Sequence, residues 1–201
     1  MIMIWDTFSP IYDFAETLYN KDVYLTTGKI VAEYVGAGDI VLECACGTGA
    51  ISRFVAPKCK RLIATDMSKG MLREAEKNCA AFSNVSFYKA DLTALRCSDN
   101  SFDKVIAGNV IHLLDDPKGA LKELERVCKH GGKIIVPTYI NAAKSSQHLV
   151  TEGLRLFGVD FKSEFDFESY KKFFAEMGYE NAEYRVAEGR MDCAIAIITK
   201  N

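Results

Sequence analysis

The feature that most constrains the fold is a regular alternation of short β-branched runs with helical stretches from about residue 39 onward. The runs read, in chain order, DIVLECA, RLIATD, VSFYKAD, FDKVIAGN and GKIIVPT. Strands that alternate with helices pair in parallel, because each right-handed crossover returns the chain to the same end of the sheet. The sequence therefore predicts an α/β fold with a doubly wound, mostly parallel sheet at its centre.

Two of the connecting stretches each carry one apolar stripe, as helices packed on a sheet do. Ser68 is placed to cap the first helix, whose buried face comprises Met71, Leu72, Ala75, Cys79 and Phe82. Asp116 and Pro117 open the second, whose stripe comprises Ala120, Leu121, Leu124, Val127 and Cys128. Gly131 is predicted to stop that helix in the left-handed conformation. The stretch LTALRCSDNS is short and irregular, with room for one helical turn.

The remaining stretches extend this core at both ends. Before residue 39, a helix packing on the sheet is indicated by Val23, Thr27, Ile30, Val31, Tyr34 and Val35. Helical patterns follow at about 142–157 and 166–177, the second closed by Gly178, and two strand-like runs then flank a turn at Gly189 and Arg190. We predict a single domain with an N-terminal helical segment (1–38), a cofactor-binding core (39–139), a helical cap (140–178) and a terminal hairpin (179–201).

Composition disfavours several classes of partner. The 201 residues carry a formal net charge of -2 and no basic stripe that would follow a nucleic-acid backbone. The N-terminus lacks the basic head and long apolar core of a signal peptide, and no apolar run approaches the roughly 20 residues of a membrane helix. The seven scattered cysteines are an odd number and indicate reduced thiols. We expect a cytoplasmic protein with no nucleic-acid or membrane partner.

Three acidic residues stand where three successive predicted strands end: Glu43, Asp66 and Asp91. Parallel strands place their carboxyl ends along one edge of the sheet, where the ligands of such sheets bind. Any one of these acids alone is typical of a helix cap or a solvated loop. Three in series, beside a turn containing Gly47 and Gly49, indicate a ligand site on that edge.

The residues of the glycine turn disfavour a phosphate-bearing ligand. The segment GTGAIS places Ser52 where the dinucleotide-binding pattern G-x-G-x-x-G has its third glycine, and the turn has no lysine of a phosphate-binding loop. S-adenosylmethionine carries an ammonium, a sulfonium, a ribose diol and an adenine amino group, and it has no phosphate. Three carboxylates complement those donors and charges, so we predict S-adenosylmethionine as the cofactor.

The stretch VLECACGTGA also raises the question of a metal site. We expect the side chains of Cys44 and Cys46 to point to opposite faces of the sheet or into the turn. There is no second cysteine pair and no nearby histidine at ligand spacing, and we predict no metal.

Taken together, the motifs resemble those of the class I S-adenosylmethionine-dependent methyltransferases. The resemblance is to the small methyltransferase domain of ubiquinone and menaquinone biosynthesis enzymes. It rests on VLECACGTGAIS, IATDMS, FYKADL and FDKVIAGNVIHLLDDPKGALKELERVCKHGGKIIV, and it covers about residues 10–139 well and the tail loosely. It implies a Rossmann-like sheet of seven strands whose last strand is antiparallel, which agrees with the terminal hairpin.

The resemblance assigns roles to the three acids. Glu43 would lie near the methionine end of the cofactor, and Asp66 would accept both ribose hydroxyls, with Met67 against the adenine face. Asp91 would accept the adenine amino group, with Leu92 packing beside it.

The resemblance also assigns roles to the residues of the glycine turn and to Asn109. Gly47 and Gly49 would let the backbone approach the cofactor, Asn109 would lie under the sulfonium region, and Cys44 and Ala45 complete the predicted cofactor site. Ala45 stands where the family has its usual first glycine. Its methyl group fits if φ is negative, so we expect binding to persist.

Two residues are candidates for catalysis. His112, after the fourth strand, would act as a general base or orient the acceptor. The alternative interpretation is a structural role, as a half-buried histidine bonded to a backbone carbonyl. Tyr12, in PIYDFA, resembles the N-terminal Tyr-Asp pair that folds over the cofactor in related enzymes, and its alternative is an ordinary helix aromatic. Tyr139 ends the fifth strand and would line the acceptor pocket.

The predicted function is methyl transfer to a small, partly apolar or aromatic molecule by a monomer or homodimer. The N-terminal segment and the helices after residue 140 would close the acceptor pocket and bring Leu149, Leu154, Leu156, Phe157, Phe161, Phe165 and Phe167. The alternative is a noncatalytic S-adenosylmethionine-binding regulatory module, with a nicotinamide-dependent reductase as a weaker third. A thiol-bound arsenic acceptor held by Cys97, Cys128 and Cys193 is disfavoured, because Cys128 lies on a core-facing stripe.

Overall fold

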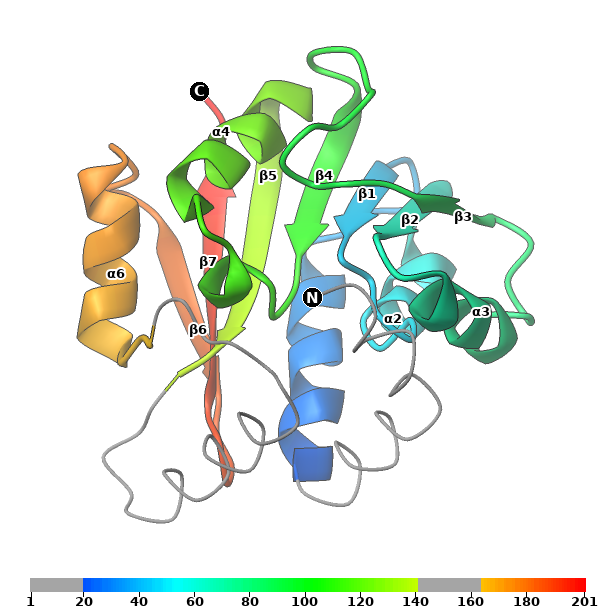
Figure 1. Cartoon of the computed structure of the whole chain (residues 1–201), viewed down its shortest axis with the longest axis horizontal. Coiled ribbons are helices and arrows are strands. Elements are labelled where there is room, and N and C mark those ends of the chain that lie inside the picture. Colours follow the sequence, from blue (N-terminus) through cyan, green and yellow to red (C-terminus); the bar gives the residue numbers. More distant parts are fainter. Residues whose placement is uncertain (1–19, 141–163) are drawn as a thin grey trace.

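A computed structural model describes residues 20–140 and 164–201, and within them seven strands form one continuous sheet (Figure 1). The spatial order is β3-β2-β1-β4-β5-β7-β6. The strands are β1 (Ile40–Cys44), β2 (Arg61–Asp66), β3 (Val85–Lys89), β4 (Phe102–Ala107), β5 (Cys128–Tyr139), β6 (Glu183–Ala187) and β7 (Cys193–Thr199). β1 to β5 pair in parallel, and β7 runs antiparallel between β5 and β6. The predicted fold class is confirmed.

The chain covers both faces of the sheet, which therefore has a separate core on each side. Along β1, Leu42 and Cys44 belong to the core under α4 (Pro117–Val127) and α6 (Phe167–Glu176). Val41 and Cys46 belong to the opposite core, under a helix over residues 20–33, α2 (Ser52–Val55) and α3 (Lys69–Asn78). The alternation of Val41 and Leu42 follows from the two-residue period of a strand. Cys46 lies beyond the end of β1, and the turn at Ala45 places it on the side opposite to Cys44, as predicted.

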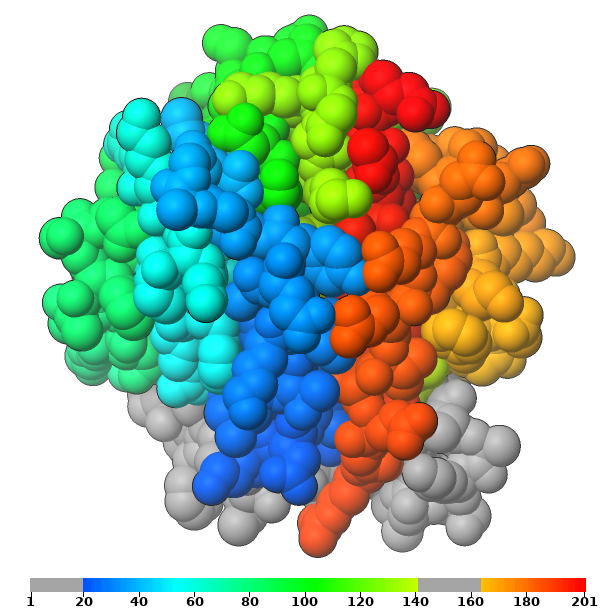
Figure 2. Space-filling view, turned by 180° about the vertical axis from the view of Figure 1, so that it is seen from behind, coloured from blue at the N-terminus to red at the C-terminus, as the bar shows by residue number. Residues whose placement is uncertain are grey.

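The helix over residues 20–33 is held between two distant parts of the chain. From behind, the space-filling view shows it (blue) flanked by the α2 region (cyan) on one side and by the β6–β7 hairpin (orange) on the other (Figure 2). Val23 and Val31 of this helix are fully buried. The prediction of a packed helix before residue 39 is confirmed for residues 20–33.

Side-chain caps begin the helices where the sequence predicts them. The Ser68 hydroxyl accepts a hydrogen bond from the backbone N–H of Met71, and the Asp116 carboxylate accepts one from Gly119. At the far end of α6, Gly178 has φ 88° and closes the helix as predicted. The predicted helix over 142–157 lies outside the described residues. Two 3-10 turns, η1 (Ala56–Lys58) and η2 (Ile111–Leu113), complete the described helices, and none of these helices is both long and apolar enough to cross a membrane.

The predicted C-terminal end of α4 is wrong. The helix ends at Val127, and Cys128, which the apolar stripe had included, already opens β5. Gly131 does have a positive φ of 73°, but it lies within β5 and donates its N–H to the Lys200 carbonyl. A glycine stop is unnecessary because the loop before β4 donates two backbone N–H groups to the carbonyls of Arg126 and Val127.

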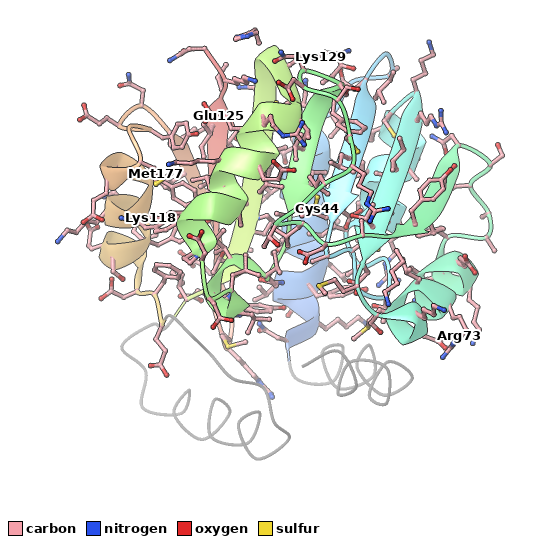
Figure 3. The ribbon with its side chains drawn as sticks, turned by 45° about the horizontal axis from the view of Figure 1, so that its top comes forward. Cys44, Arg73, Lys118, Glu125, Lys129 and Met177 are labelled. Carbon is pink, nitrogen blue, oxygen red and sulfur yellow. The ribbon has the colours of Figure 1, made fainter. Side chains whose placement is uncertain are left out.

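Lys200, the residue after β7, binds carbonyl groups at the C-terminal end of α4. Its Nζ donates to the carbonyls of Glu125 and Cys128, each at 2.8 Å, and to Asn100 Oδ1 at 2.8 Å. α4 runs from near Lys118 to Glu125, with Lys129 just beyond it (Figure 3). A cation at the carboxyl end of a helix is favoured by both the unpaired carbonyls and the helix dipole.

We expect Lys200→Met to lower the free energy of unfolding by about 1–2 kcal/mol, because three charge-assisted bonds are lost and the carbonyls are left without them. Urea unfolding followed by circular dichroism measures the change. Lys118→Met is the matched control, because Lys118 forms only an exposed ion pair with Glu176 at 3.5 Å and its loss costs less than about 0.5 kcal/mol. Equal effects of the two substitutions would show that Lys200 does not cap the helix.

Candidate functional site

A cavity of about 610 Å³ lies at the carboxyl ends of the parallel strands. Each of these five strands contributes a lining residue at or just after its end, and in sheet order these are Asp91, Asp66, Glu43, Asn109 and Tyr139. The cavity therefore runs along the sheet edge, across the point between β1 and β4 where the strand order reverses. Ligands of open α/β sheets bind at such a point.

The structure brings eight of the ten predicted cofactor residues to this cavity: Glu43, Ala45, Gly47, Asp66, Met67, Asp91, Leu92 and Asn109. Cys44 is fully buried in the core on the α4 side. Gly49 packs on α3 instead, where an added Cβ would lie 3.2 Å from Cys79 Sγ and 3.3 Å from Ala75 Cα. The requirement for glycine at position 49 therefore comes from helix packing and from its φ of 85°.

Backbone donors fix the Asp66 carboxylate in place. Its Oδ2 accepts from the Gly47 N–H at 2.9 Å, and its Oδ1 accepts from the Ser68 N–H at 2.8 Å. Backbone donors from two different segments, the turn after β1 and the start of α3, thus orient the carboxylate toward the cavity that it lines.

The Asp91 carboxylate is held differently, by Thr93, two residues later in the chain. Both the backbone N–H and the hydroxyl of Thr93 donate to Asp91 Oδ1, at 2.9 and 2.7 Å. These bonds occupy the lone pairs of Oδ1 and direct a ligand's donor to Oδ2. The neighbouring lining residues are apolar: Leu92 is buried, and Met67 is 38% exposed.

Glu43 is a buried acid at the middle of the cavity. It is 2% exposed, and Ser52 donates its hydroxyl to Glu43 Oε2 at 2.7 Å. The pKa of Glu43 is raised to about 8, mainly by burial and also by the nearby Asp66 charge, although the hydrogen bonds from Ser52 lower it. A cation brought beside this carboxyl would favour its ionised form.

The expectation that Ala45 has a negative φ is wrong. Its φ is 51°, in the left-handed region that favours glycine, and Gly47 at φ 54° shares that conformation. The reason is the tight turn after β1, in which the Cys46 N–H returns to the Thr65 carbonyl at 2.9 Å. The backbone of Ala45 is strained in this conformation, because its Cβ lies close to the following carbonyl oxygen. Alanine has the smallest side chain after glycine.

Asn109 links the ends of β4 and β5. Its N–H donates to the Pro137 carbonyl at 2.8 Å, and its Oδ1 accepts from the Tyr139 N–H at 3.1 Å. It too has a positive φ, 53°, which asparagine tolerates better than most residues. Tyr139 lines the cavity, and its contact with an acceptor stays a prediction.

The two predicted catalytic residues have different outcomes. His112 lies in η2, is 6% exposed, and is absent from the described cavity lining, although its neighbours Val110 and Leu113 are part of it. Burial lowers the pKa of His112 to about 4, so the imidazole is neutral at physiological pH. Tyr12 lies outside the described residues, and so do the predicted acceptor residues between positions 141 and 163.

Several lining residues were missed. Tyr24 and Thr27 reach the cavity from the helix over residues 20–33, and Thr48 and Ile51 come from the turn after β1. Thr27 had been placed on the buried face of its helix without a role. The signal that could have found it is a hydroxyl on an otherwise apolar stripe, which needs a partner when it is buried.

The cysteines do not form a thiol site. All seven are free, and Cys128 and Cys193 belong to the cores on opposite faces of the sheet, so Cys97 cannot gather with both. Across the described ranges, 20–140 and 164–201, no three His, Cys, Asp or Glu side chains are grouped as ligands of a metal ion. A thiol-bound arsenic acceptor therefore has no support from these residues.

Known proteins share this arrangement in sequence. A family model described as a methyltransferase domain matches residues 42–136. The demethylmenaquinone methyltransferase of Renibacterium salmoninarum is 33% identical over 138 residues, 68% of this chain and 57% of that protein. The ubiquinone/menaquinone biosynthesis C-methyltransferase of Bdellovibrio bacteriovorus is 35% identical over 130 residues, 62% of this chain and 55% of that protein. The matched region thus spans little more than half the length of these relatives.

A solved structure shares the whole fold. The chain superposes on a Thermotoga maritima protein described as a SAM-dependent methyltransferase and possible histamine N-methyltransferase, with a TM-score of 0.76. The superposition covers 99% of this chain and 100% of that one at 21% sequence identity. At that identity the likeness establishes the fold and leaves the acceptor open.

We expect Glu43→Gln to raise stability by an amount that grows as pH rises from about 4.5 to about 8. Between its ordinary pKa of 4.5 and the folded value of about 8, the folded protein holds a proton on Glu43 that the unfolded chain releases. The stability that the neutral carboxyl contributes is therefore fully present below pH 4.5, and it is lost as pH rises through the folded pKa of about 8. Glutamine stays neutral, so the variant should gain at least about 1 kcal/mol over the wild type at alkaline pH.

Urea unfolding at pH 5 and at about pH 8.5 tests this expectation. Glu168→Gln serves as the control and should show no such gain, because the Glu168 side chain in α6 is 79% exposed and pairs only with the neighbouring Lys171 among the described residues. A Glu43→Gln gain that is the same at both pH values would contradict the buried, protonated state of Glu43.

We expect Ala45→Gly to leave the stability unchanged or raised. In the folded state, glycine removes about 1–2 kcal/mol of strain from the left-handed conformation. In the unfolded state, its greater conformational freedom lowers the stability by about 0.4–1 kcal/mol. Ala120→Gly is the matched control, because Ala120 lies within α4 (Pro117–Val127) and is buried, so its replacement should cost about 1 kcal/mol or more. Denaturant unfolding of both variants provides the comparison, and an equal loss in both would show that Ala45 is not strained.

Proposed function

The chain belongs to the class I S-adenosylmethionine-dependent methyltransferases, and from that premise we propose that it methylates a small, partly apolar or aromatic molecule. The observation that carries the proposal is the row of acids along the cavity, with Asp91, Asp66 and Glu43 at the ends of adjacent strands. Among the described lining residues there is no lysine, arginine or histidine. Such a cavity suits a ligand with cationic groups and donors, and it disfavours the pyrophosphate of a nicotinamide dinucleotide.

The cofactor would lie along the sheet edge in the order of the strands. Asp91 Oδ2 would accept the adenine amino group, with Leu92 and Met67 providing the apolar contacts of the ring. Asp66 suits the ribose position, because backbone donors from Gly47 and Ser68 fix the orientation of a carboxylate that lines the cavity, and a carboxylate accepts from the two hydroxyls of a diol. Glu43 would then face the ammonium at the amino-acid end.

The acceptor would occupy the other end of the cavity, beyond Asn109. The lining there is mostly apolar and comprises Val110, Leu113, Leu114 and Tyr139. One relative named above is called a demethylmenaquinone methyltransferase and the other a ubiquinone/menaquinone biosynthesis C-methyltransferase, and a fused-ring aromatic acceptor fits this apolar end. We therefore propose a hydroxylated bicyclic aromatic compound as the acceptor class.

S-adenosylmethionine supplies a methyl group that the sulfonium already activates, so the protein's main task is to hold and orient both molecules. Asn109 contributes by fixing the end of β5, where Tyr139 borders the acceptor space. His112 and Tyr12 remain predicted catalytic residues. The neutral imidazole of His112 has the protonation state that a general base needs, but its burial means that η2 would have to open for contact.

We expect the protein to bind S-adenosylmethionine and S-adenosylhomocysteine and not NADH in calorimetric titration. Asp66→Asn should weaken binding of both sulfur ligands by about 30-fold or more, because an amide replaces one acceptor with a donor. Asp99→Asn is the control, since Asp99 is exposed and pairs with Arg126 away from the cavity. Binding of NADH without a response to either sulfur ligand would overturn the proposed function.

A second measurement separates an enzyme from a noncatalytic binding module. With a naphthol or naphthohydroquinone acceptor, or with a metabolite extract, the enzyme should accumulate S-adenosylhomocysteine above the rate without acceptor. Tight cofactor binding without any turnover across such a panel would favour the regulatory module instead.

A further inference from the structure

We propose that Tyr24 and Thr27 bind the α-carboxylate at the amino-acid end of S-adenosylmethionine, and this inference rests on the proposed function. Both residues line the cavity and lie three positions apart on the helix over residues 20–33, so they share one face of it. They would make the first described helix a part of the cofactor site.

The Thr27 hydroxyl is a buried polar group that needs a partner. The residue is 4% exposed, and its Oγ1 has no hydrogen-bond partner among the residues that the structure describes. Buried hydroxyls are nearly always satisfied, because removal from water without a replacement bond is costly. Since Thr27 borders the cavity, a ligand there is the natural partner.

The Tyr24 hydroxyl is arranged to donate. Arg53 Nη2 donates a hydrogen bond to the Tyr24 oxygen, and the Arg53 guanidinium lies 4.8 Å from the centre of the Tyr24 ring. Because its oxygen accepts from a cation, the tyrosine's own proton is directed elsewhere and is a stronger donor. Arg53 is thus a positioning residue that acts through Tyr24.

The charges of the cavity explain why such donors are needed. The described lining contains three carboxylates and no cationic side chain. An α-carboxylate entering this cavity would be repelled unless hydroxyl or amide donors met it. Tyr24 and Thr27 supply two donors without adding a positive charge that would repel the ammonium and the sulfonium.

The two donors and Glu43 belong to one cavity and are linked through α2. Tyr24, Thr27 and Glu43 all line the cavity, and Ser52 donates to Glu43 while the next residue, Arg53, donates to Tyr24. Tyr24 is thus connected through two neighbouring residues to the acid proposed for the ammonium. An amino acid carries its ammonium and carboxylate on one carbon, so their partners must be neighbours.

The helix that carries these donors is held in place before any ligand binds. At one end, Asn20 Nδ2 donates to the Met191 carbonyl at 2.7 Å in the β6–β7 hairpin. In the middle, Gly28 packs so closely on α2 that an added Cβ would lie 2.2 Å from the Phe54 ring. Figure 2 shows the helix wedged between these two regions. Donors held in this way bind with little loss of conformational freedom.

The test compares three ligands on the full chain by calorimetry: S-adenosylmethionine, its decarboxylated form and 5′-methylthioadenosine. Thr27→Val and Tyr24→Phe should each weaken binding of S-adenosylmethionine about 10-fold or more, since each removes one donor to a charged group. Binding of the two ligands without a carboxylate should change less than about 2-fold. Thr27→Ser keeps the hydroxyl and should bind nearly as the wild type does.

Measurements of the free energy of unfolding show whether a variant binds weakly only because it is less well folded. Without ligand, Thr27→Val should be at least as stable as the wild type, because it removes an unsatisfied buried hydroxyl. Thr138→Val is the matched control: Thr138 is fully buried on β5 outside the cavity lining, and this change should leave binding of all three ligands unaltered.

The outcomes separate the two levels of the proposal. Selective weakening for S-adenosylmethionine supports the inference, whereas unchanged binding, or equal weakening for all three ligands, overturns the carboxylate role and leaves the proposed function intact. If the wild-type protein binds none of the three ligands, the proposed function fails together with the inference.

Discussion

β1 is hydrogen-bonded on both sides, to β2 and to β4, and its side chains are buried on both faces of the sheet. A strand in that position cannot bend away gradually, because its neighbours occupy all the space beside it. The chain therefore leaves β1 through a sharp turn, in which residues 45, 47 and 49 all have positive φ. This turn opens the space between β1 and β4 and starts α2, and the geometry of the cavity depends on it.

The turn also determines how the acids are presented. Because the Gly47 N–H points to Asp66, the turn itself orients the carboxylate of the neighbouring strand. Ser52 comes one helical turn later and donates to Glu43 beneath it. Two acids on adjacent strands are thus oriented by one short segment, residues 47–52. The site is a consequence of how β1 ends, and α2, which is only four residues long, serves mainly to bring Ser52 and Arg53 into position.

The sequence predicts the sheet well because its signals are local. Each β-branched run became a strand, and the acids at the ends of β1, β2 and β3 came together because parallel strands share an edge. The errors arose where distant segments decide. α4 ends at Val127 because Lys200 and the loop before β4 satisfy its carbonyls, and neither is visible in the helix's own sequence.

The site was predicted in part for the same reason. Strand-end residues such as Asp66 could be placed from topology alone, whereas the sign of φ at Ala45 depends on the register of the turn against β2. Tyr24 and Thr27 were missed because their approach to the cavity depends on how one helix packs against α2 and the β6–β7 hairpin. Periodicity identified the buried face of that helix, but it could not show that part of this face borders a cavity.

Three unfavourable features lie among the residues that line the cavity. Ala45 has a left-handed φ, Glu43 is a buried carboxyl with a raised pKa, and the Thr27 hydroxyl has no described partner. The helix ends far from the cavity, by contrast, are satisfied by caps such as Asp166 and Lys200. A sequence selected for stability alone would replace these three residues with glycine, glutamine and valine. Three such costs around one cavity favour a ligand that offsets them, and the ammonium and carboxylate of an amino acid would offset two of the three at once.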